Sequence, residues 1–145
     1  MKCSAIMKTD VECCPRGETV EAAAERMRNR NVGFLPVCDG VRAIVGTVTD
    51  RDLAIRVLAE HRPASNTLVA DVMSPELVCC SPEDELEVAE SLMAEHKKSR
   101  IVCADDRRRP VGIISLSDIA QVEDIATVSR VLGSITAREA YRPQI

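Results

Sequence analysis

The alternation of apolar and polar positions along the chain predicts helices and strands in one order that occurs twice. Residues 19–30 form an amphipathic segment, and so do residues 85–97. In the first, the apolar side chains stand at the i, i+3, i+4, i+7 spacing of one helix face: Val20, Ala23, Ala24 and Met27. Apolar stretches predict strands at 34–38 and 43–48, at 101–104 and 111–114, and shorter strands ending at Cys14 and Cys80. The predicted order is therefore β-α-β-β-α, twice.

The second half of the chain repeats the first at a spacing of 66 residues. Met7 corresponds to Met73 in this register, and no gap is needed from residue 7 to residue 54. One unit of about 60 residues would bury too little apolar surface to be robust alone. We therefore predict an α/β fold (α+β type) of two tandem repeats packed sheet to sheet about a pseudo-twofold axis. The predicted divisions are 1–62 for the first repeat, 63–67 for the linker, 68–132 for the second repeat and 133–145 for a C-terminal tail.

Further helices are predicted after the last strand of each repeat. One is expected over residues 50–59, and in the second repeat helix continues over residues 119–132 and on to Thr136, with Gly133 as a candidate end. Residues 138–145 are expected to form a loose tail.

The segments with the most chemical content run from Gly46 to Asp52 and from Gly112 to Asp118. Each has Gly, then Thr or Ser three residues on, then Asp three residues later. One interpretation is a helix cap, in which the hydroxyl and the carboxylate satisfy free N–H groups. The other adds a ligand: a helix start with free N–H groups suits a phosphate, and an ionised Asp accepts hydrogen bonds from a ribose diol. The candidate binding residues of the two segments are Thr49, Asp50, Arg51, Asp52, Ser115, Ser117 and Asp118.

Two other stretches recur and supply the remaining candidates. Cys13 and Cys79 precede the two cysteines that end the first strands, and adjacent strand residues point to opposite faces. The cysteines are read either as small buried apolar residues or as redox or metal groups. Gly33, and Ser99 in the second repeat, leave room beside a strand end where backbone groups could read an adenine edge. The candidate residues from these stretches are Cys13, Gly33, Phe34, Cys79, Lys98 and Arg100, of which the two cations are candidate phosphate partners.

Composition narrows the functional classes. Net charge is −4 and Phe34 and Tyr141 are the only aromatic residues, which argues against nucleic-acid binding by charge or by base stacking. No apolar run is long enough to predict a membrane span, and the N-terminus has no secretory signal pattern. Seven cysteines without such a signal favour a reducing cytoplasm, and isolated His61 and His96 with no CxxC motif do not predict a zinc site.

These motifs together resemble the CBS domain family, named after cystathionine β-synthase, whose tandem pairs form Bateman modules. The Gly46–Asp52 and Gly112–Asp118 segments are similar to the family's signature at the end of its third strand. Two more segments are similar to family motifs, residues 35–39 (LPVCD) and residues 71–75 (DVMSP). The resemblance covers roughly residues 3–122 and is greatest to short bacterial proteins that contain little besides the CBS pair.

The resemblance implies a non-catalytic regulatory module that binds AMP, ADP, ATP or S-adenosylmethionine in a cleft between the repeats. It places ribose binding on Asp52 and Asp118, and phosphate contact on Thr49 and Ser115. Purine contact falls on Cys13, Cys79, Gly33 and Arg100. It also implies a homodimer, formed through exposed apolar positions of the helices: Ile55, Leu58, Ile125 and Val128.

Two alternatives from other classes remain open. One is an interaction or dimerisation protein that binds no ligand and uses its apolar helices to bind a partner protein. The other is a thiol redox or metal sensor that uses Cys3, Cys13, Cys38, Cys79 or Cys103. An enzyme is not predicted, because no nucleophile–base arrangement, phosphate-binding loop or metal motif is recognised in the sequence.

Overall fold

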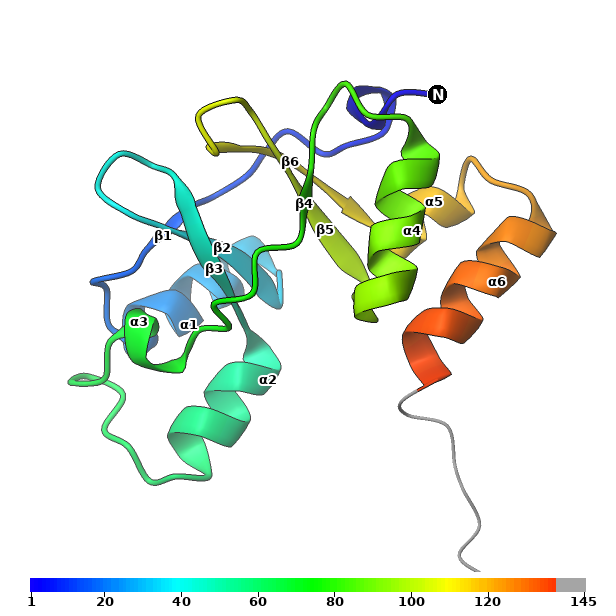
Figure 1. The fold of residues 1–145 in the computed structure, drawn as a ribbon. Coiled ribbons are helices and arrows are strands. Elements are labelled where there is room, and N and C mark those ends of the chain that lie inside the picture. Colours follow the sequence, from blue (N-terminus) through cyan, green and yellow to red (C-terminus); the bar gives the residue numbers. More distant parts are fainter. Residues whose placement is uncertain (138–145) are drawn as a thin grey trace, which may run out of the picture. The chain divides into compact units, whose positions relative to one another are not determined.

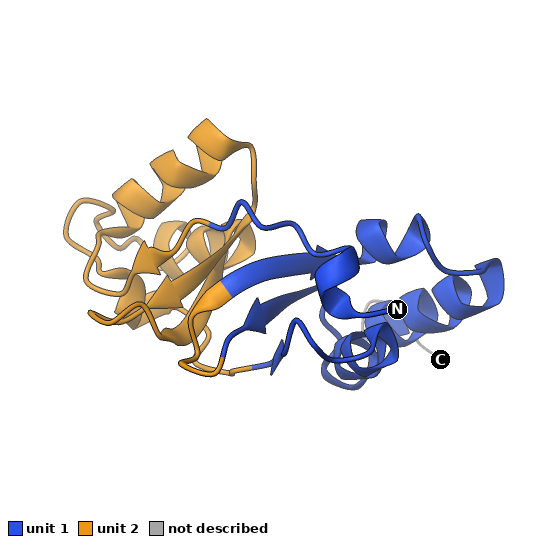
Figure 2. Ribbon diagram, turned by 90° about the horizontal axis from the view of Figure 1, so that it is seen from above, with its two compact units in different colours: residues 1–11, 78–105, 111–145 blue, residues 12–77, 106–110 orange. Residues whose placement is uncertain are grey.

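The computed structural model describes residues 1–137, and these form two compact units, which Figure 2 colours separately. Unit 1 consists of residues 1–11, 78–105 and 111 onward, and unit 2 consists of residues 12–77 and 106–110. The predicted packing of the repeats against each other stays a prediction.

Unit 2 carries the first β-α-β-β-α repeat (Figure 1). Its elements are β1 (Cys14–Pro15), α1 (Val20–Arg30), β2 (Phe34–Cys38), β3 (Ile44–Thr49), α2 (Asp50–Leu53), the π-helix η2 (Ala54–Leu58) and α3 (Val69–Val72). The sheet order is β1-β2-β3, with β1 parallel and β3 antiparallel to β2. Helix α1 begins where the Ala22 N–H donates to the Thr19 hydroxyl, and it ends at Asn31, which is left-handed with φ 53°.

Unit 1 carries the second repeat and one helix more. Its elements are η1 (Cys3–Ala5), β4 (Cys79–Cys80), α4 (Leu86–His96), β5 (Arg100–Ala104), β6 (Pro110–Ser115), α5 (Leu116–Ala120) and α6 (Ile125–Thr136). The sheet order is β4-β5-β6. Helix α6 packs against α4, beside which it runs in Figure 1, and its buried Val131 and Ile135 join the core of this unit.

The compact units differ from the divisions predicted along the sequence. The N-terminal segment, predicted as part of the first repeat, belongs to unit 1: Leu86 N–H donates to Met1 O at 2.8 Å, and Cys3 is fully buried in that core. Residues 68–77, predicted to open the second repeat, belong to unit 2, where Val69 and Val72 are buried. The segment that opens each repeat thus supplies apolar side chains to the core that contains the other repeat's sheet. The sequence pattern, which follows local order only, does not reveal this exchange.

Two helix predictions differ from the structure. The expected helix over 50–59 is α2 followed by the π-turns of η2, and the expected continuous helix after residue 119 breaks before Asp124, whose carboxylate accepts from Thr127 N–H at 2.7 Å. Gly133 does not end α6, which continues to Thr136 because Ile135 is buried one turn beyond Val131. The predicted tail at 138–145 lies outside the described residues.

Candidate functional site

The Thr49–Asp52 turn of unit 2 is a reciprocal helix cap. The Asp52 N–H donates to Thr49 Oγ1 at 3.1 Å, and the Thr49 N–H donates to Asp52 Oδ2 at 2.9 Å. The capping interpretation of this motif is therefore confirmed. The cap fixes the Asp52 side chain where β3 passes into α2.

Unit 1 repeats this cap with Ser115 and Asp118. The Asp118 N–H donates to Ser115 Oγ at 3.2 Å, and Asp118 Oδ2 accepts from both the N–H and the hydroxyl of Ser115 at 2.8 Å. The Ser115 hydroxyl thus donates its hydrogen bond to the Asp118 carboxylate. The two caps have the same backbone plan.

The second carboxylate oxygen of each Asp lies near a cation that the sequence analysis did not single out. Asp52 Oδ1 is 3.9 Å from Arg56 Nε, and Asp118 Oδ1 is 3.3 Å from Lys8 Nζ. The two carboxylate side chains are 16% and 14% exposed, so both remain partly accessible. The pKa of Asp118 lies below its ordinary value: burial raises it, but the hydrogen bonds from Ser115 and the Lys8 ammonium outweigh burial. An ionised carboxylate with one oxygen outside the cap can accept a hydroxyl hydrogen bond.

The expected free N–H groups at the start of α2 are not found. Asp50 N–H donates to Gly33 O at 3.0 Å and Arg51 N–H donates to Asp50 Oδ1 at 2.8 Å, while Asp52 N–H is used in the cap. In unit 1 the Leu116 N–H likewise donates to Ser99 O at 2.9 Å. The prediction that these backbone groups hold a phosphate is therefore wrong for the positions named, because the chain's own oxygens already occupy them.

The room expected beside Gly33 is taken up by the protein itself. A Cβ on Gly33 would lie 2.5 Å from Asp50 Oδ2. The glycines of the two cap segments are equally crowded: a Cβ on Gly46 would lie 2.5 Å from Ser74 O, and one on Gly112 would lie 2.4 Å from Met7 Sδ. The expectation that Gly33 leaves room for an adenine edge is therefore corrected, because residues of the same unit fill that space.

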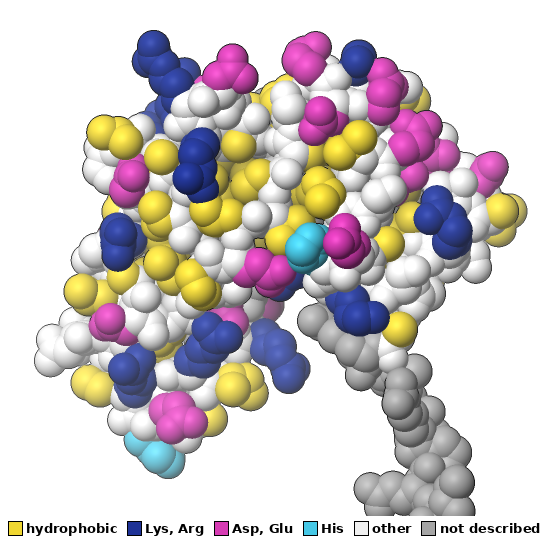
Figure 3. Space-filling view, viewed as in Figure 1, with side chains coloured by type: hydrophobic (Ala, Val, Ile, Leu, Met, Phe, Trp, Pro, Cys, Tyr) yellow, Lys and Arg dark blue, Asp and Glu magenta, His cyan; other side chains and the backbone are white. Residues whose placement is uncertain are grey.

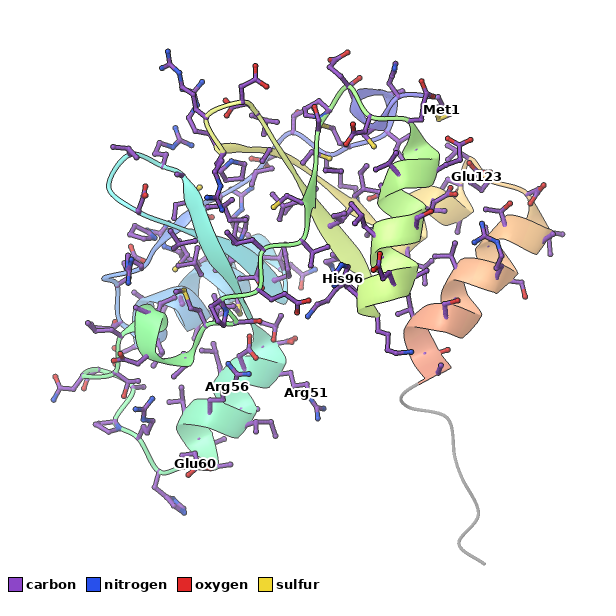
Figure 4. The ribbon with its side chains drawn as sticks, viewed as in Figure 1. Met1, Arg51, Arg56, Glu60, His96 and Glu123 are labelled. Atoms are coloured by element: carbon purple, nitrogen blue, oxygen red, sulfur yellow. The ribbon has the colours of Figure 1, made fainter. Side chains whose placement is uncertain are left out.

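The remaining candidates fall into two groups. Phe34 is half-buried at the start of β2 and pairs with Thr49 in the antiparallel register, so the structure brings these two together. Arg51 extends from α2 as an exposed side chain (Figure 4), and the candidates Ser117 and Arg100 in unit 1 are exposed as well. Lys98 is half-buried, as are Cys13 and Cys79, each one residue before a buried cysteine. The exposed face in Figure 3 shows Lys and Arg side chains interspersed with Asp and Glu.

Two features of residues 1–137 bear on the predictions of a metal site and of a membrane span. No group of three or more His, Cys, Asp or Glu side chains in this part of the chain is placed to hold a metal ion. Among the helices of the same residues, none is long and apolar enough to cross a membrane. Cys3, Cys14, Cys38, Cys80 and Cys103 are buried.

The structure has two repeats with the same order of elements, and each repeat has the same helix cap. Both features agree with one protein family. The chain belongs to the CBS domain family, whose model matches residues 3–59 and 69–124. It is 41% identical over 115 residues to the CBS domain-containing protein YhcV of Bacillus subtilis, covering 79% of each chain. It is 29% identical over 116 residues to hypoxic response protein 1 of Mycobacterium tuberculosis, covering 80% of each.

Solved structures share the fold. The CBS domain protein TA0289 of Thermoplasma acidophilum matches with a TM-score of 0.81 at 22% identity, covering 92% of this chain and 75% of that one. Hypoxic response protein I, solved with two coordinated zinc ions, matches with a TM-score of 0.76 at 28% identity, covering 83% and 98%. The CBS pair of protein MJ0100, solved with 5-methylthioadenosine and S-adenosyl-L-methionine, matches with a TM-score of 0.74 at 21% identity, covering 84% and 94%. The predicted tandem CBS pair is confirmed.

Proposed function

We propose that this chain is a non-catalytic regulatory module that binds an adenosine-containing ligand: AMP, ADP, ATP or S-adenosylmethionine. Each unit contributes one half-site, centred on Asp52 in unit 2 and on Asp118 in unit 1. The observation that carries the proposal is the repeated cap, which fixes one carboxylate oxygen and leaves the other partly accessible. A ribose offers two adjacent hydroxyl donors, which an ionised carboxylate accepts.

In this proposal side chains bind the purine and the phosphate of the ligand, since the backbone N–H groups of Asp50, Arg51, Asp52 and Leu116 already donate to other groups of the chain. Phe34 and Cys13 in unit 2, and Cys79 in unit 1, are half-buried apolar or weakly polar groups suited to a purine edge. Arg51 and Arg100 are exposed and carry the positive charge that a phosphate requires. Lys98 is a further cationic candidate in unit 1. A phosphate is thus bound by flexible side chains in this proposal, and its contribution to affinity depends on salt.

The MJ0100 CBS pair supports the ligand class, because a protein of this fold holds adenosyl compounds. At 21% identity, this structure supports the ability of the fold to bind adenosyl compounds, but it does not identify the ligand of this chain. Binding regulates only if the ligand has different affinities for two arrangements of the protein.

Isothermal titration with each of the four compounds tests the proposal. We expect saturable binding by the wild type, and a loss of about 10- to 100-fold for Asp52→Asn or Asp118→Asn, since each removes the charge from a hydrogen bond to ribose. Asp124→Asn is the matched control: Asp124 caps α6 through Thr127 and belongs to neither half-site, so affinity should not change. No binding of any of the four compounds by folded wild-type protein would reject the ligand and leave the interaction protein as the better hypothesis.

We also propose that the chain forms a homodimer, as expected for the family. The α2–η2 segment of unit 2 exposes Ile55 at 51% and Leu58 at 76%, and α6 of unit 1 exposes Ile125 at 89%. Val128, named with them, instead packs against the core of unit 1. Light scattering of Leu58→Asp is expected to show a shift toward monomer; an unchanged mass for this variant and for Ile125→Asp would exclude these faces.

A further inference from the structure

Cys13, which directly precedes β1, is hydrogen-bonded through its thiol to Cys38, the last residue of β2. The parallel register pairs Cys14 with Val37 and Pro15 with Cys38. Because strand side chains alternate between faces, Cys14 points away from the face of Cys38, and it is fully buried in the core. Cys13 itself is only half-buried. The fold thus places one accessible thiol beside one buried thiol.

The polar contacts of this pair make its two thiols unequal. A hydrogen bond from Cys38 and the charge and hydrogen bond of Arg42 lower the pKa of Cys13 to about 7, although burial acts to raise it. The pKa of Cys38 is raised by the hydrogen bond to Cys13, by burial and by the negative charge of Cys13, with a further contribution from Asp39. Cys13 therefore holds the thiolate and Cys38 keeps its proton. A thiol whose pKa lies near ambient pH is the most effective attacking group in thiol–disulfide exchange.

Arg42 is held near the pair by the turn between β2 and β3. Its φ is 65°, and its N–H donates to Asp39 O at 3.1 Å. The Asp39 carboxylate Oδ1 accepts from the N–H groups of Val41 and Ala43, each at 3.0 Å. The backbone that carries the cation is therefore fixed by the same aspartate that follows Cys38.

Unit 1 offers an internal comparison at the positions 66 residues later. Cys79 stands where Cys13 stands and Arg108 where Arg42 stands, but Ala104 replaces Cys38. In unit 1 the sulfur of Cys80 lies 3.5 Å from that of Cys103 and 4.0 Å from that of Cys3. All three are buried, and the hydrogen bond with Cys103 together with burial raises the pKa of Cys80. A buried thiol with a raised pKa is a poor nucleophile.

We propose that Cys13 is the reactive thiol of this protein and that low-molecular-weight disulfides convert Cys13 and Cys38 into a reversible disulfide. The Cys13 thiolate attacks one sulfur of the reagent, whose S–S bond breaks, and one reagent thiolate leaves. The mixed disulfide on Cys13 carries no charge, so Cys38 loses the neighbour that held its proton. Cys38 then gives its proton to solvent and attacks the Cys13 sulfur, which releases the second reagent thiolate. Two protein thiols are oxidised and one reagent disulfide is reduced to two thiols. This proposal does not depend on the adenosine ligand.

Oxidised glutathione and intact-mass measurement test the proposal on the full chain. The wild type is expected to lose two hydrogen atoms, to retain no glutathione and to yield a cross-linked peptide that contains Cys13 and Cys38. Cys38→Ala is expected to stop at one glutathione on Cys13; alanine suits this position because Ala104 occupies the corresponding position in unit 1. Cys79→Ala is the matched control and should behave as the wild type does. Arg42→Gln is expected to raise the midpoint of the pH–rate profile by about one unit.

Labelling of the wild type with substoichiometric iodoacetamide needs no variant. Modification of Cys13 ahead of the other six cysteines supports the proposal. Earlier modification of Cys79 or of any other cysteine overturns it, and so does a glutathione-induced disulfide that leaves Cys13 reduced.

Discussion

In unit 2 the face of α1 that carries Ala24 is exposed, whereas in unit 1 the corresponding face of α4 is covered by α6 (Figure 1). The uncovered face of α1 borders a groove of ≈ 420 Å³ that is also lined by Leu53 and Val57. The position of Ala24 is taken in unit 1 by Glu90, which is only 2% exposed. The additional helix of unit 1 thus buries a helical position whose equivalent in unit 2 is exposed.

The glycine before each cap shows a second difference. Backbone hydrogen bonds are the same in both units: β3 exchanges N–H···O bonds with Ser74 through Thr47, and β6 exchanges them with Lys8 through Ile113. Both glycines face a methionine side chain, Met73 in unit 2 and Met7 in unit 1, but in unit 2 the atom nearest to an added Cβ is the backbone oxygen of Ser74. The duplication has therefore kept the backbone plan while side-chain packing has changed, so equivalent substitutions should have unequal effects.

The largest expected difference concerns Gly46→Ala and Gly112→Ala. At Gly46 the new methyl group meets the backbone oxygen of Ser74, a residue that two backbone hydrogen bonds to Thr47 hold in place, so the free energy of unfolding should fall by about 3 kcal/mol. At Gly112 it meets Met7 Sδ and Cγ, which can move to another rotamer, and Met7 Cβ at 2.9 Å, which needs only a small shift, so the loss should be smaller, about 1.5 kcal/mol. Urea unfolding of both variants measures the difference. Equal losses would show that the two glycines have equivalent surroundings, and a larger loss at Gly112 would reverse the proposed contrast.

The second largest expected effect is the pH dependence of the unfolding free energy that buried Glu90 causes. The pKa of Glu90 is raised to about 7: burial is the largest cause, Glu123 and Glu87 add to the rise, and Arg130 opposes it. Glu123 lies in the turn before α6 (Figure 4), and Oε1 of Glu90 has no hydrogen-bond partner. Because the folded-state pKa is above the ordinary 4.5, the contribution of Glu90 to stability is present in full below about pH 4.5 and is lost as pH rises to about 7. Glu90→Gln should abolish this fall and be more stable by about 2 kcal/mol above pH 7, as measured by urea unfolding across pH.

Ala24→Glu places the same carboxyl at the equivalent exposed position. Its unfolding free energy should stay within about 0.5 kcal/mol of the wild type at every pH between 5 and 8. If Glu90→Gln shows no pH-dependent gain, or if Ala24→Glu shows the same loss as native Glu90, the contrast between the covered and uncovered helix faces does not hold.

The sequence predicts features that depend on one short segment, and it does not predict contacts between segments that are far apart in the chain. Strand β2 matches the predicted 34–38, and Thr49 and Ser115 cap helices as predicted, because a strand pattern and a cap depend on residues within one short segment. Lys8 lies 110 residues before Asp118 and no local pattern joins them. Glu90 is buried because α6 packs against α4. The amphipathic pattern of α6 predicts that the helix has a buried face, but it does not predict which element that face packs against. The occupied N–H of Asp50 was missed because its acceptor, Gly33 O, lies just before β2 and is not part of the local cap motif.

The smallest effect separates the two cations beside the capping carboxylates. Arg56 also donates to Val72 O and Met73 O, at 2.9 and 3.2 Å, so it ties η2 to α3, whereas Lys8 is 72% exposed and acts on Asp118 through its charge. Lys8→Ala should therefore lower stability at neutral pH by no more than about 0.5 kcal/mol, with the loss vanishing at high salt. Since the pKa of Asp118 lies below the ordinary 3.8, the contribution of this carboxylate is present above that pH and is lost as pH falls. An NMR titration of Asp118 should show its pKa rise in Lys8→Ala while remaining low, because both Ser115 hydrogen bonds persist. Arg56→Ala should cost more than Lys8→Ala and keep its cost at high salt; the reverse order, or an unchanged Asp118 titration in Lys8→Ala, would mean that the two half-sites do not differ in the way their cations are held.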